Sequence, residues 1–434
     1  FRGWENPNDE KYANFNAVEI IWTYWCDLGC KYCYVNRYGK ELYPMSEKVS
    51  EETMLNNLKL FLDWMRKKGY KPKIDFFSGE PLVQASSFKA LKMIIDFLGE
   101  DIPEGENKVK KGGGLVVIPT NYTWIISDQL TKRVDELIEY GLSKNVIVGL
   151  SASIDGKYMD SNRPYKYQIE SMTYDHGIVT WGYNEGLPDP RDDAYYDKVF
   201  SYARKYQYGF HPMIYSEKIE LWKDNFLWFQ EMFKKYDIPW WEIYLLEVRN
   251  PEWSSKQITE FGKFVEFLIE WSWMKCGNDF NNFRNFLFKG KGLNILNNAL
   301  STTGRGLGCG YQSMVYVRMA DLSIVTCHRT SYDPYVTGKF VVENEEIKRI
   351  QVQNLEYYVA GISLHTDSLP YCETCVIKHL CTHGCLGAQM ETTGDPFTPI
   401  PTVCVLEHEK IWAIIRAFKK LRIYEGILSL SLIH

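Results

Sequence analysis

The chain has 434 residues, of which 45% are hydrophobic and 24% are charged, and its formal net charge is −5. This length predicts two or three domains, and this composition excludes wholesale disorder. A slightly acidic chain is not typical of a nucleic-acid backbone binder, and the absence of an apolar run of about 18 residues or of a basic-then-apolar leader predicts a soluble protein outside the membrane.

Residues 17–275 alternate between strand-like and helix-like segments. Six strand-then-helix units imply a parallel sheet with right-handed crossovers, either an open doubly wound sheet or a partial barrel. A polar, Tyr-rich insertion interrupts the series at about 157–191. The predicted strands lie near 17–22, 73–77, 115–119, 146–154, 209–215 and 241–246, and the predicted helices near 51–65, 86–98, 128–140, 221–235 and 258–274.

The character of the sequence changes after Cys276. Residues 277–308 are rich in Asn, Phe and Gly and predict a linker with one short helix. Hairpin-like pieces follow at 314–319 and 323–326, then closely spaced cysteines and an amphipathic helix at about 406–421. We therefore predict a first domain at 1–275, a linker at 276–308, a second domain at 309–421 and a tail at 422–434.

Eleven cysteines, an odd number, indicate the cellular environment. A secreted disulfide scaffold is shorter and normally pairs an even number. Clusters with two to five residues between cysteines are instead typical of metal or iron–sulfur ligation, because one short loop must reach one ion or cluster. The sequence thus predicts a reducing, cytoplasmic location.

Cys26, Cys30 and Cys33 form the first cluster, directly after the first predicted strand. Chemistry in barrels and doubly wound folds lies at this carboxyl end of the strands. Three thiolates can hold three irons of a [4Fe–4S] cluster and leave the fourth iron open. The alternative is zinc, which normally requires a fourth protein ligand nearby, yet no His or Cys lies between Cys33 and His176.

A second set of cysteines lies in the last third of the chain. Zinc is again the alternative to iron–sulfur ligation there, since two tetrahedral sites need eight ligands and three histidines are close by. The cysteines are Cys309, Cys327, Cys372, Cys375, Cys381, Cys385 and Cys404, and the histidines are His328, His379 and His383.

The triad, with Tyr32 before its third cysteine, resembles the signature of the radical S-adenosylmethionine (SAM) superfamily. Later segments resemble the superfamily's SAM-contacting motifs in the same order: Phe77-Ser78-Gly79-Glu80-Pro81, Thr120-Asn121, Ser153-Ile154-Asp155-Gly156 with Arg163, and Glu247-Val248-Arg249-Asn250. The resemblance implies that the triad binds a [4Fe–4S] cluster. It also implies SAM contacts at Tyr32, Ser78, Gly79, Glu80, Asn121, Ser153, Arg163 and Val248.

The second cysteine set resembles the SPASM domain, an extension that carries two auxiliary [4Fe–4S] clusters. The resemblance implies an α/β fold: a partial (β/α)6 barrel of radical SAM type, followed by a small cysteine-rich α+β SPASM domain. The family usually has Gly where this chain has Leu322. By this resemblance Cys309, Cys327 and Cys385 hold the nearer auxiliary cluster, and Cys372, Cys375, Cys381 and Cys404 hold the outer one.

The nearer cluster then lacks a fourth thiolate, and several readings stay open. The vacant iron binds a substrate group, or Cys276 supplies the fourth ligand. Otherwise Cys276 is a catalytic hydrogen-atom donor, as in radical peptide epimerases, or a buried thiol.

These resemblances imply three [4Fe–4S] clusters and SAM as cofactors. SAM is reductively cleaved to a 5′-deoxyadenosyl radical, which takes hydrogen from a peptide substrate and so crosslinks or oxidises it during maturation of a ribosomally made peptide. His328 is a candidate catalytic base, because some sulfatase maturases carry an Asp at the position after this cysteine. The implied partners are a peptide or protein substrate, an electron donor such as flavodoxin or ferredoxin, and a separate leader-peptide-binding protein.

Other functions stay open. One is a reaction like that of anaerobic sulfatase maturases, and another is a small-molecule radical SAM dehydrogenase. A function of a different class is a non-catalytic electron-transfer or zinc-scaffolded binding protein, which would not cleave SAM.

Overall fold

A computed structural model describes residues 15–37, 49–103, 109–173, 178–183, 189–288, 314–333, 335–354, 371–378, 380–381 and 384–423. The chain divides into two compact units. Unit 1 comprises Phe1–Ser153, Arg163–Val199 and Gly310–Ser363, and unit 2 comprises Ile154–Asn162, Phe200–Cys309 and Leu364–His434. No helix within the described ranges is long and apolar enough to cross a membrane.

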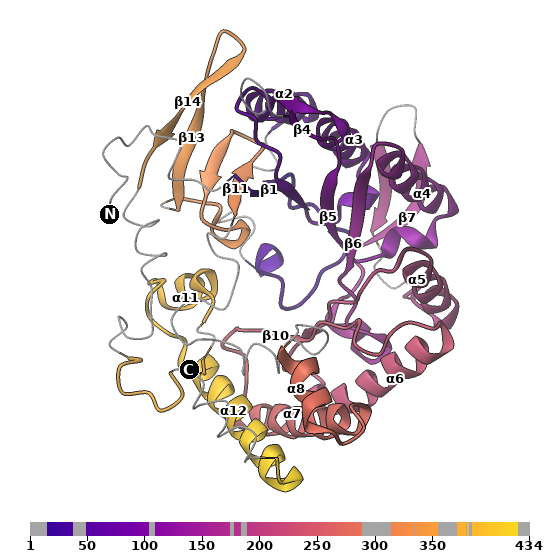
Figure 1. Cartoon of the computed structure of the whole chain (residues 1–434), viewed down its shortest axis with the longest axis vertical. Coiled ribbons are helices and arrows are strands. Elements are labelled where there is room, and N and C mark those ends of the chain that lie inside the picture. Colours follow the sequence, from indigo (N-terminus) through magenta and orange to yellow (C-terminus); the bar gives the residue numbers. More distant parts are fainter. Residues whose placement is uncertain are drawn as a thin grey trace. The chain divides into compact units, whose positions relative to one another are not determined.

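Unit 1 is built on an eight-stranded sheet with the order β14-β13-β12-β11-β1-β2-β5-β6 (Figure 1). The strands from β11 to β6 are parallel, and β11 to β14 form an antiparallel meander. Most residues of β1 and β11 are buried, whereas β2, β5 and β6 alternate between buried and more exposed positions. The strands are β1 (Ala17–Ile21), β2 (Lys73–Phe77), β5 (Gly114–Thr120), β6 (Val146–Ala152), β11 (Val315–Arg318), β12 (Ser323–Val325), β13 (Val336–Glu343) and β14 (Glu346–Val352).

Helices α2 (Glu51–Lys67), α3 (Ala85–Gly99) and α4 (Asp128–Ser143) connect the consecutive parallel strands of unit 1. Serine side chains begin two of them: Ser50 accepts a hydrogen bond from the Thr53 N–H, and Ser127 from the Leu130 N–H. Such caps satisfy backbone donors that have no partner within the helix. Because each helix returns the chain to the same edge of the sheet, the strands' carboxyl ends, and the loops after them, lie together.

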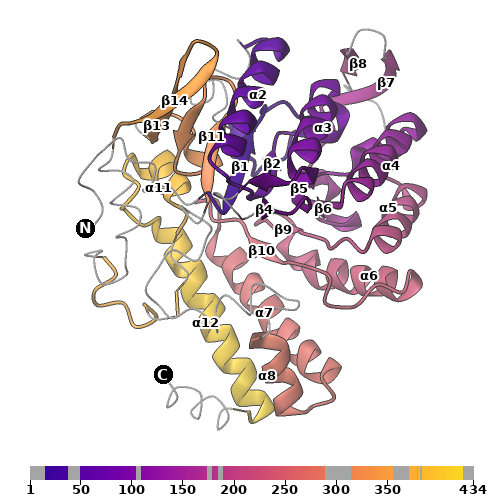
Figure 2. The same ribbon diagram turned by 45° about the horizontal axis from the view of Figure 1, so that its top comes forward.

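Unit 2 is mainly helical. Its long helices α7 (Ser255–Lys275) and α12 (Pro401–Leu421) lie side by side (Figures 1 and 2). Gly262 of α7 faces the Glu409 side chain of α12, where a Cβ atom would lie 2.0 Å from the carboxylate, so any larger residue would displace that side chain. The other elements are η5 (Lys157–Asn162), β9 (Met213–Ile214), α6 (Trp222–Lys235), β10 (Leu246–Glu247), α8 (Phe280–Phe288) and α11 (Leu386–Thr393), and α5 (Asp193–Tyr206) spans the boundary of the units.

The first four predicted strands and their helices are confirmed, with bounds that differ by a few residues. The prediction of full fifth and sixth strands at 209–215 and 241–246 was wrong. Only β9 and β10 form there, as a separate parallel pair of two residues each, preceded by an isolated bridge between Phe210 and Ile243. Pro212 explains the interruption, since it has no N–H to donate to a neighbouring strand.

Later segments confirm some predicted elements and add others. The hairpin-like pieces predicted at 314–319 and 323–326 form β11 and β12, but the parallel pairing of β11 with β1 was not predicted. The insertion at 157–191 contains the hairpin of β7 (Tyr167–Thr173) and β8 (Ile178–Tyr183). Helix α8 is the one short helix expected after Cys276. The predicted bounds at 275, 309 and 421 stay a prediction.

Candidate functional site

The cysteine triad lies on a loop that leaves the carboxyl end of β1 in unit 1. Cys30 is buried, whereas Cys26 and Cys33 are partly exposed. A turn follows, in which the Cys33 N–H donates to the Cys30 carbonyl at 3.1 Å, and residues 34–37 begin a helical turn. Three thiols are therefore presented by one short, turned segment.

The first anchor of this loop is the end of β2. Here the Gly79 N–H donates to the Thr23 carbonyl at 3.0 Å, and the Glu80 N–H donates to the Trp25 carbonyl at 2.9 Å. A Cβ atom on Gly79 would lie 2.0 Å from the Trp25 oxygen, so only glycine permits this approach. Gln84 closes the junction, because its side-chain amide donates to the Trp25 carbonyl at 3.2 Å.

A second anchor lies beyond the triad's first cysteine. The Gly29 N–H donates to the Pro164 carbonyl at 2.7 Å, and the Lys166 N–H donates to the Asp27 carbonyl at 2.8 Å. Between them, Leu28 forms an antiparallel bridge with Tyr165. The loop is thus fixed on both sides by backbone hydrogen bonds rather than by its cysteines.

Two buried carboxyl groups lie beneath the loop. Glu80 accepts hydrogen bonds from the Thr120 hydroxyl at 2.8 Å, the Asn121 N–H at 2.5 Å and the Leu82 N–H at 3.1 Å. Burial, and then the nearby Asp27 carboxyl, raises the pKa of Glu80 to about 8. Glu80 therefore ties β2 to the end of β5.

Asp27 is the second of these carboxyl groups, and it is fully buried. Its Oδ1 accepts a hydrogen bond from the Asn121 side-chain amide at 2.9 Å, whereas its Oδ2 has no hydrogen-bond partner among the described residues. Burial raises the pKa of Asp27. Burial also raises the pKa of Cys26, and the nearby Asp27 and then Cys30 raise it further. The site therefore favours a neutral thiol unless a cation binds there.

Arg163 brings positive charge to the triad. Its Nε lies 3.3 Å from the Cys30 sulfur, and the guanidinium also donates to the Ser153 carbonyl. Ser153 is placed by its own N–H, which donates to the Thr120 carbonyl at 2.8 Å. A guanidinium beside a thiol favours the thiolate that an iron requires.

The structure thus brings most of the predicted SAM-contacting residues of unit 1 to the triad loop. Ser78 lies in the same junction, where its hydroxyl shares a hydrogen bond with Thr23 at 2.9 Å. Tyr32 is half-buried. Val248 belongs to unit 2, where its N–H donates to the Ile214 carbonyl at 2.8 Å. That these residues contact SAM stays a prediction.

His328 follows β12 in unit 1. Its Nδ1 lies 2.9 Å from Oε1 of Glu19, which is a buried residue of β1. The imidazole stacks on Phe77 with ring centroids 4.4 Å apart, and Tyr34, next to Cys33, stacks on it at 6.1 Å. His328 is therefore held in one orientation within the unit that carries the triad.

The second cysteine set is divided between the units. Cys309 lies outside the described residues, as do His379 and His383. Cys327 belongs to unit 1 and Cys385 to unit 2, so their predicted common cluster stays a prediction.

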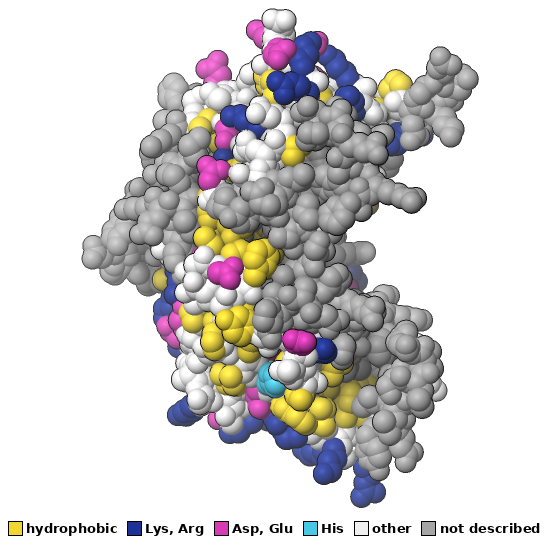
Figure 3. All heavy atoms as spheres, turned by 90° about the vertical axis from the view of Figure 1, so that its left-hand side faces the viewer, with side chains coloured by type: hydrophobic (Ala, Val, Ile, Leu, Met, Phe, Trp, Pro, Cys, Tyr) yellow, Lys and Arg dark blue, Asp and Glu magenta, His cyan; other side chains and the backbone are white. Residues whose placement is uncertain are grey.

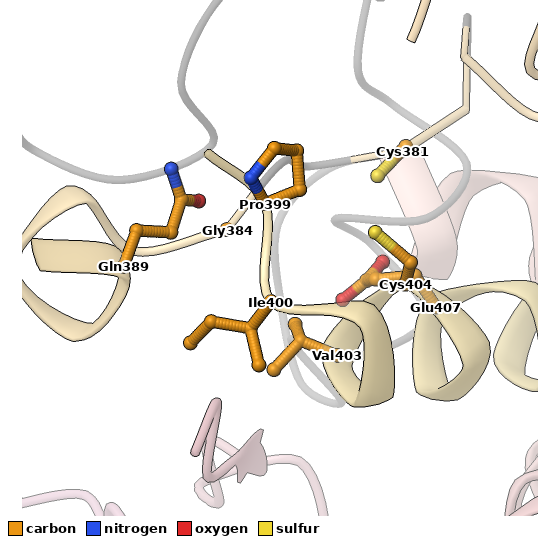
Figure 4. A pocket seen from close by; sticks show the side chains of 8 residues that line it. All are labelled: Cys381, Gly384, Gln389, Pro399, Ile400, Val403, Cys404 and Glu407. Atoms are coloured by element: carbon orange, nitrogen blue, oxygen red, sulfur yellow. The ribbon is translucent and has the colours of Figure 1, made fainter. Parts of the chain in front are cut away.

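The four remaining cysteines of this set gather in unit 2. The thiols of Cys381 and Cys404 point toward one another across a pocket lined also by Glu407 (Figure 4). Burial, followed by the influence of Cys372, Cys375 and Glu407, raises the pKa of Cys404 to about 11. Cys372 and Cys375 therefore lie near enough to Cys404 to influence its charge.

The donor sets at both places fit iron–sulfur clusters. Three thiols on the triad loop match a cubane with one open iron, and four thiols in unit 2 match a fully ligated one. Within the described ranges, no three His, Cys, Asp or Glu side chains converge tightly enough to hold a single metal ion. Cluster ligands need not converge in this way, because each thiolate binds a different iron.

Cys276 caps the end of α7 and is half-buried. Burial, and then Asp279, raises its pKa. Because Cys309 lies outside the described residues, the possible roles of Cys276 as ligand, hydrogen-atom donor or core thiol all stay open.

A buried ionic cluster in unit 2 was not predicted. Lys410 Nζ lies 2.9 Å from Glu247 and 2.8 Å from Glu407, and Arg249 lies 3.0 Å from Glu247. Burial alone would raise the pKa of Glu247, but Lys410 and Arg249 hold it well below its usual range. The ionic cluster joins the end of β10 to α12, on which Cys404 lies.

Sequence reasoning also missed Gln84 and the contact partners Glu19 and His408. His408 follows Cys404 by four residues, which is one helical turn, so its spacing was a usable signal. Glu19 and Gln84 gave no comparable signal, since their partners are distant in sequence.

Residues 20–167 match the family model described as the Radical SAM superfamily. This segment of the chain is similar to the superfamily. The matched segment contains the triad loop, Glu80 and Arg163. No curated protein sequence matches the chain.

Solved structures extend the likeness beyond this segment. The structure of native anSMEcpe with bound AdoMet matches with a TM-score of 0.56 and 15% identity, over 94% of this chain and 99% of that chain. The same protein with AdoMet and a bound peptide gives the same values. At this identity the likeness shows the fold: an α/β radical SAM partial barrel with a C-terminal cysteine-rich region of SPASM architecture.

Proposed function

We propose that this radical SAM enzyme modifies a peptide or protein, and that it crosslinks or oxidises a side chain of that substrate. The observation that carries the proposal is the triad loop, whose three thiols are held between Gly79, Glu80 and Arg163. The likeness of fold to anSMEcpe, which has been solved with AdoMet and a peptide, supports the substrate class. Two auxiliary clusters in the cysteine-rich region are part of the proposal.

Cys26, Cys30 and Cys33 would hold the [4Fe–4S] cluster, which supplies the electron for the reductive cleavage of SAM. The residues of the chain position this chemistry. Gly79 and Glu80 fix the loop, and Arg163 places positive charge at the Cys30 sulfur. Because these contacts exist within one compact unit, the ligand loop is organised by the fold itself.

His328 is the proposed proton acceptor. In this role the Nδ1–H of His328 donates a hydrogen bond to the Glu19 carboxylate, which orients the ring and leaves Nε2 as the atom available to a substrate. Stacking on Phe77 restricts the ring further. A base held in this way is suited to take the proton that a substrate loses when it is oxidised.

The test uses anaerobically reconstituted protein with SAM and a reductant. We expect 5′-deoxyadenosine and methionine, and we expect the variant with Cys26, Cys30 and Cys33 all replaced by Ala to form neither. Peptides that contain Cys, Ser or paired aromatic residues are then added, and mass spectrometry detects the loss of two hydrogens. SAM cleavage that no peptide stimulates, but that a small molecule does, would contradict the substrate class.

A further inference from the structure

His408 lies against one of the cysteines assigned above to the outer auxiliary cluster. Its Nε2 is 3.3 Å from the sulfur of Cys375, within reach of a hydrogen bond. The two residues are far apart in sequence: His408 is on α12, one helical turn beyond Cys404, and Cys375 is on the loop at 371–378. One helix therefore presents both a thiol and an imidazole to this group of cysteines.

The loop that carries Cys375 is itself ordered by short-range hydrogen bonds. The Cys375 N–H donates to the Cys372 carbonyl at 3.0 Å, and the Cys381 N–H donates to the Ile377 carbonyl at 2.9 Å. These turns place three cysteines on one compact segment opposite α12. The contact between Cys375 and His408 is thus made between two locally fixed elements.

The neighbourhood of these thiols is partly apolar and lies near the surface. Val376 and Val405 are 79% and 53% exposed, and one face of the molecule shows hydrophobic side chains at its surface (Figure 3). The pocket between Cys381 and Cys404 is lined mainly by apolar and small residues, with Glu407 as its carboxylate (Figure 4). Arg249 lies near enough to Cys381 for their charges to interact, and an N–H donor at the Cys375 sulfur adds to this stabilisation of the negative charge that ligating thiolates carry.

We propose that the Nε2–H of His408 donates a hydrogen bond to the Cys375 sulfur when Cys375 ligates the outer cluster, and that this hydrogen bond raises the cluster's reduction potential. The inference rests on the proposed function, which assigns these four cysteines to a cluster. A hydrogen bond to a ligating sulfur stabilises the reduced state more, because that state carries more negative charge. His408 is a positioning residue in this role, since it acts on the cluster through Cys375.

The test is a redox titration of the reconstituted full-length chain, followed by electron paramagnetic resonance. Removing one hydrogen bond of this kind in His408→Ala is expected to lower the reduction potential of one cluster by about 59 mV, equal to a tenfold change in a one-electron equilibrium. The other clusters serve as internal references. Trp412→Ala, one turn further along α12 and 47% exposed, is the matched control and should leave all potentials unchanged.

His408→Gln keeps an N–H donor and is expected to stay near the wild-type potential. If His408→Ala assembles its clusters, an unchanged reduction potential in that variant would overturn the proposal. If it does not, His408→Gln carries the test, and a potential that falls in His408→Gln as far as expected for loss of the hydrogen bond would overturn the proposal. Nitrogen coupling strong enough for a direct iron–nitrogen bond would also overturn it. Iron content of the wild type tests the proposed function separately, since about four irons per chain would mean that no auxiliary cluster exists.

Discussion

Gly79→Ala is the most informative single change in the triad site. It adds one methyl group where the chain after β2 meets the triad loop, and a Cβ there would lie 2.0 Å from the Trp25 oxygen. Contacts of a Cβ below about 3 Å essentially never occur, so the two segments must separate by about 1 Å. The nearest atoms belong to the backbone, so no side-chain rotation relieves the clash.

The separation has a definite energetic effect. It strains the two hydrogen bonds that join the segments, from Gly79 to Thr23 and from Glu80 to Trp25. Each is worth about 1 kcal/mol, and overpacking typically costs about 1–3 kcal/mol more. We therefore expect the free energy of unfolding of unit 1 to fall by roughly 3 kcal/mol.

Denaturant unfolding of the metal-free protein measures this change, and the iron content after reconstitution measures its effect on the triad. Gly149→Ala is the matched control, because its added Cβ would make only ordinary contacts, the nearest at 3.5 Å. We expect Gly149→Ala to bind iron like the wild type and Gly79→Ala to lose iron. Equal unfolding energies and iron contents in the two variants would refute the role of the Gly79 junction.

Three further predictions concern charged groups. The pKa of Glu80 is raised from 4.5 to about 8, so the stability that its bound proton contributes is full below pH 4.5 and is lost as the pH rises through 8. Urea unfolding of the metal-free protein should show the wild type losing stability relative to Glu80→Gln across this window. Parallel pH profiles of the two proteins would contradict the prediction. Lys410→Met leaves Arg249 as the one cation of the cluster beside the two buried carboxylates, Glu247 and Glu407, so one buried negative charge is uncompensated and the free energy of unfolding should fall by about 3–5 kcal/mol. Lys420→Met, at an exposed pair, should change it little. Arg163→Lys keeps the positive charge but loses the planar guanidinium whose Nε lies beside the Cys30 sulfur. The rate of 5′-deoxyadenosine formation should therefore fall more at limiting than at saturating SAM concentration. An equal fall at the two SAM concentrations would argue against a role of Arg163 in SAM binding.

The amino-terminal half of the fold follows well from local sequence. Alternating apolar runs and amphipathic stretches give β1, β2, β5 and β6 with their helices, and serine caps mark the starts of α2 and α4. Local pattern fails where pairing is long-range. Nothing within residues 315–318 shows that β11 joins the parallel sheet beside β1, because a parallel partner is not adjacent in sequence.

The candidate site shows the same division. The cysteines, Gly79 and Arg163 were found from spacing and motif, since those features are local. Glu19 was missed because its partner His328 is 309 residues away, and the ionic cluster of Lys410 was missed because it joins a strand end to a distant helix. Leu322 shows a local rule that is broken: it has a φ of 59° in a turn where glycine would be unstrained, yet its side chain is buried.

The measurement that tests the central claim most directly is the iron and sulfide content of the anaerobically reconstituted chain, combined with the yield of 5′-deoxyadenosine. Three clusters predict about 12 irons per chain and SAM cleavage under reducing conditions. The variant lacking Cys26, Cys30 and Cys33 should retain about eight irons and form no 5′-deoxyadenosine. Bound zinc in place of iron, with no SAM cleavage by the wild type, would contradict the account.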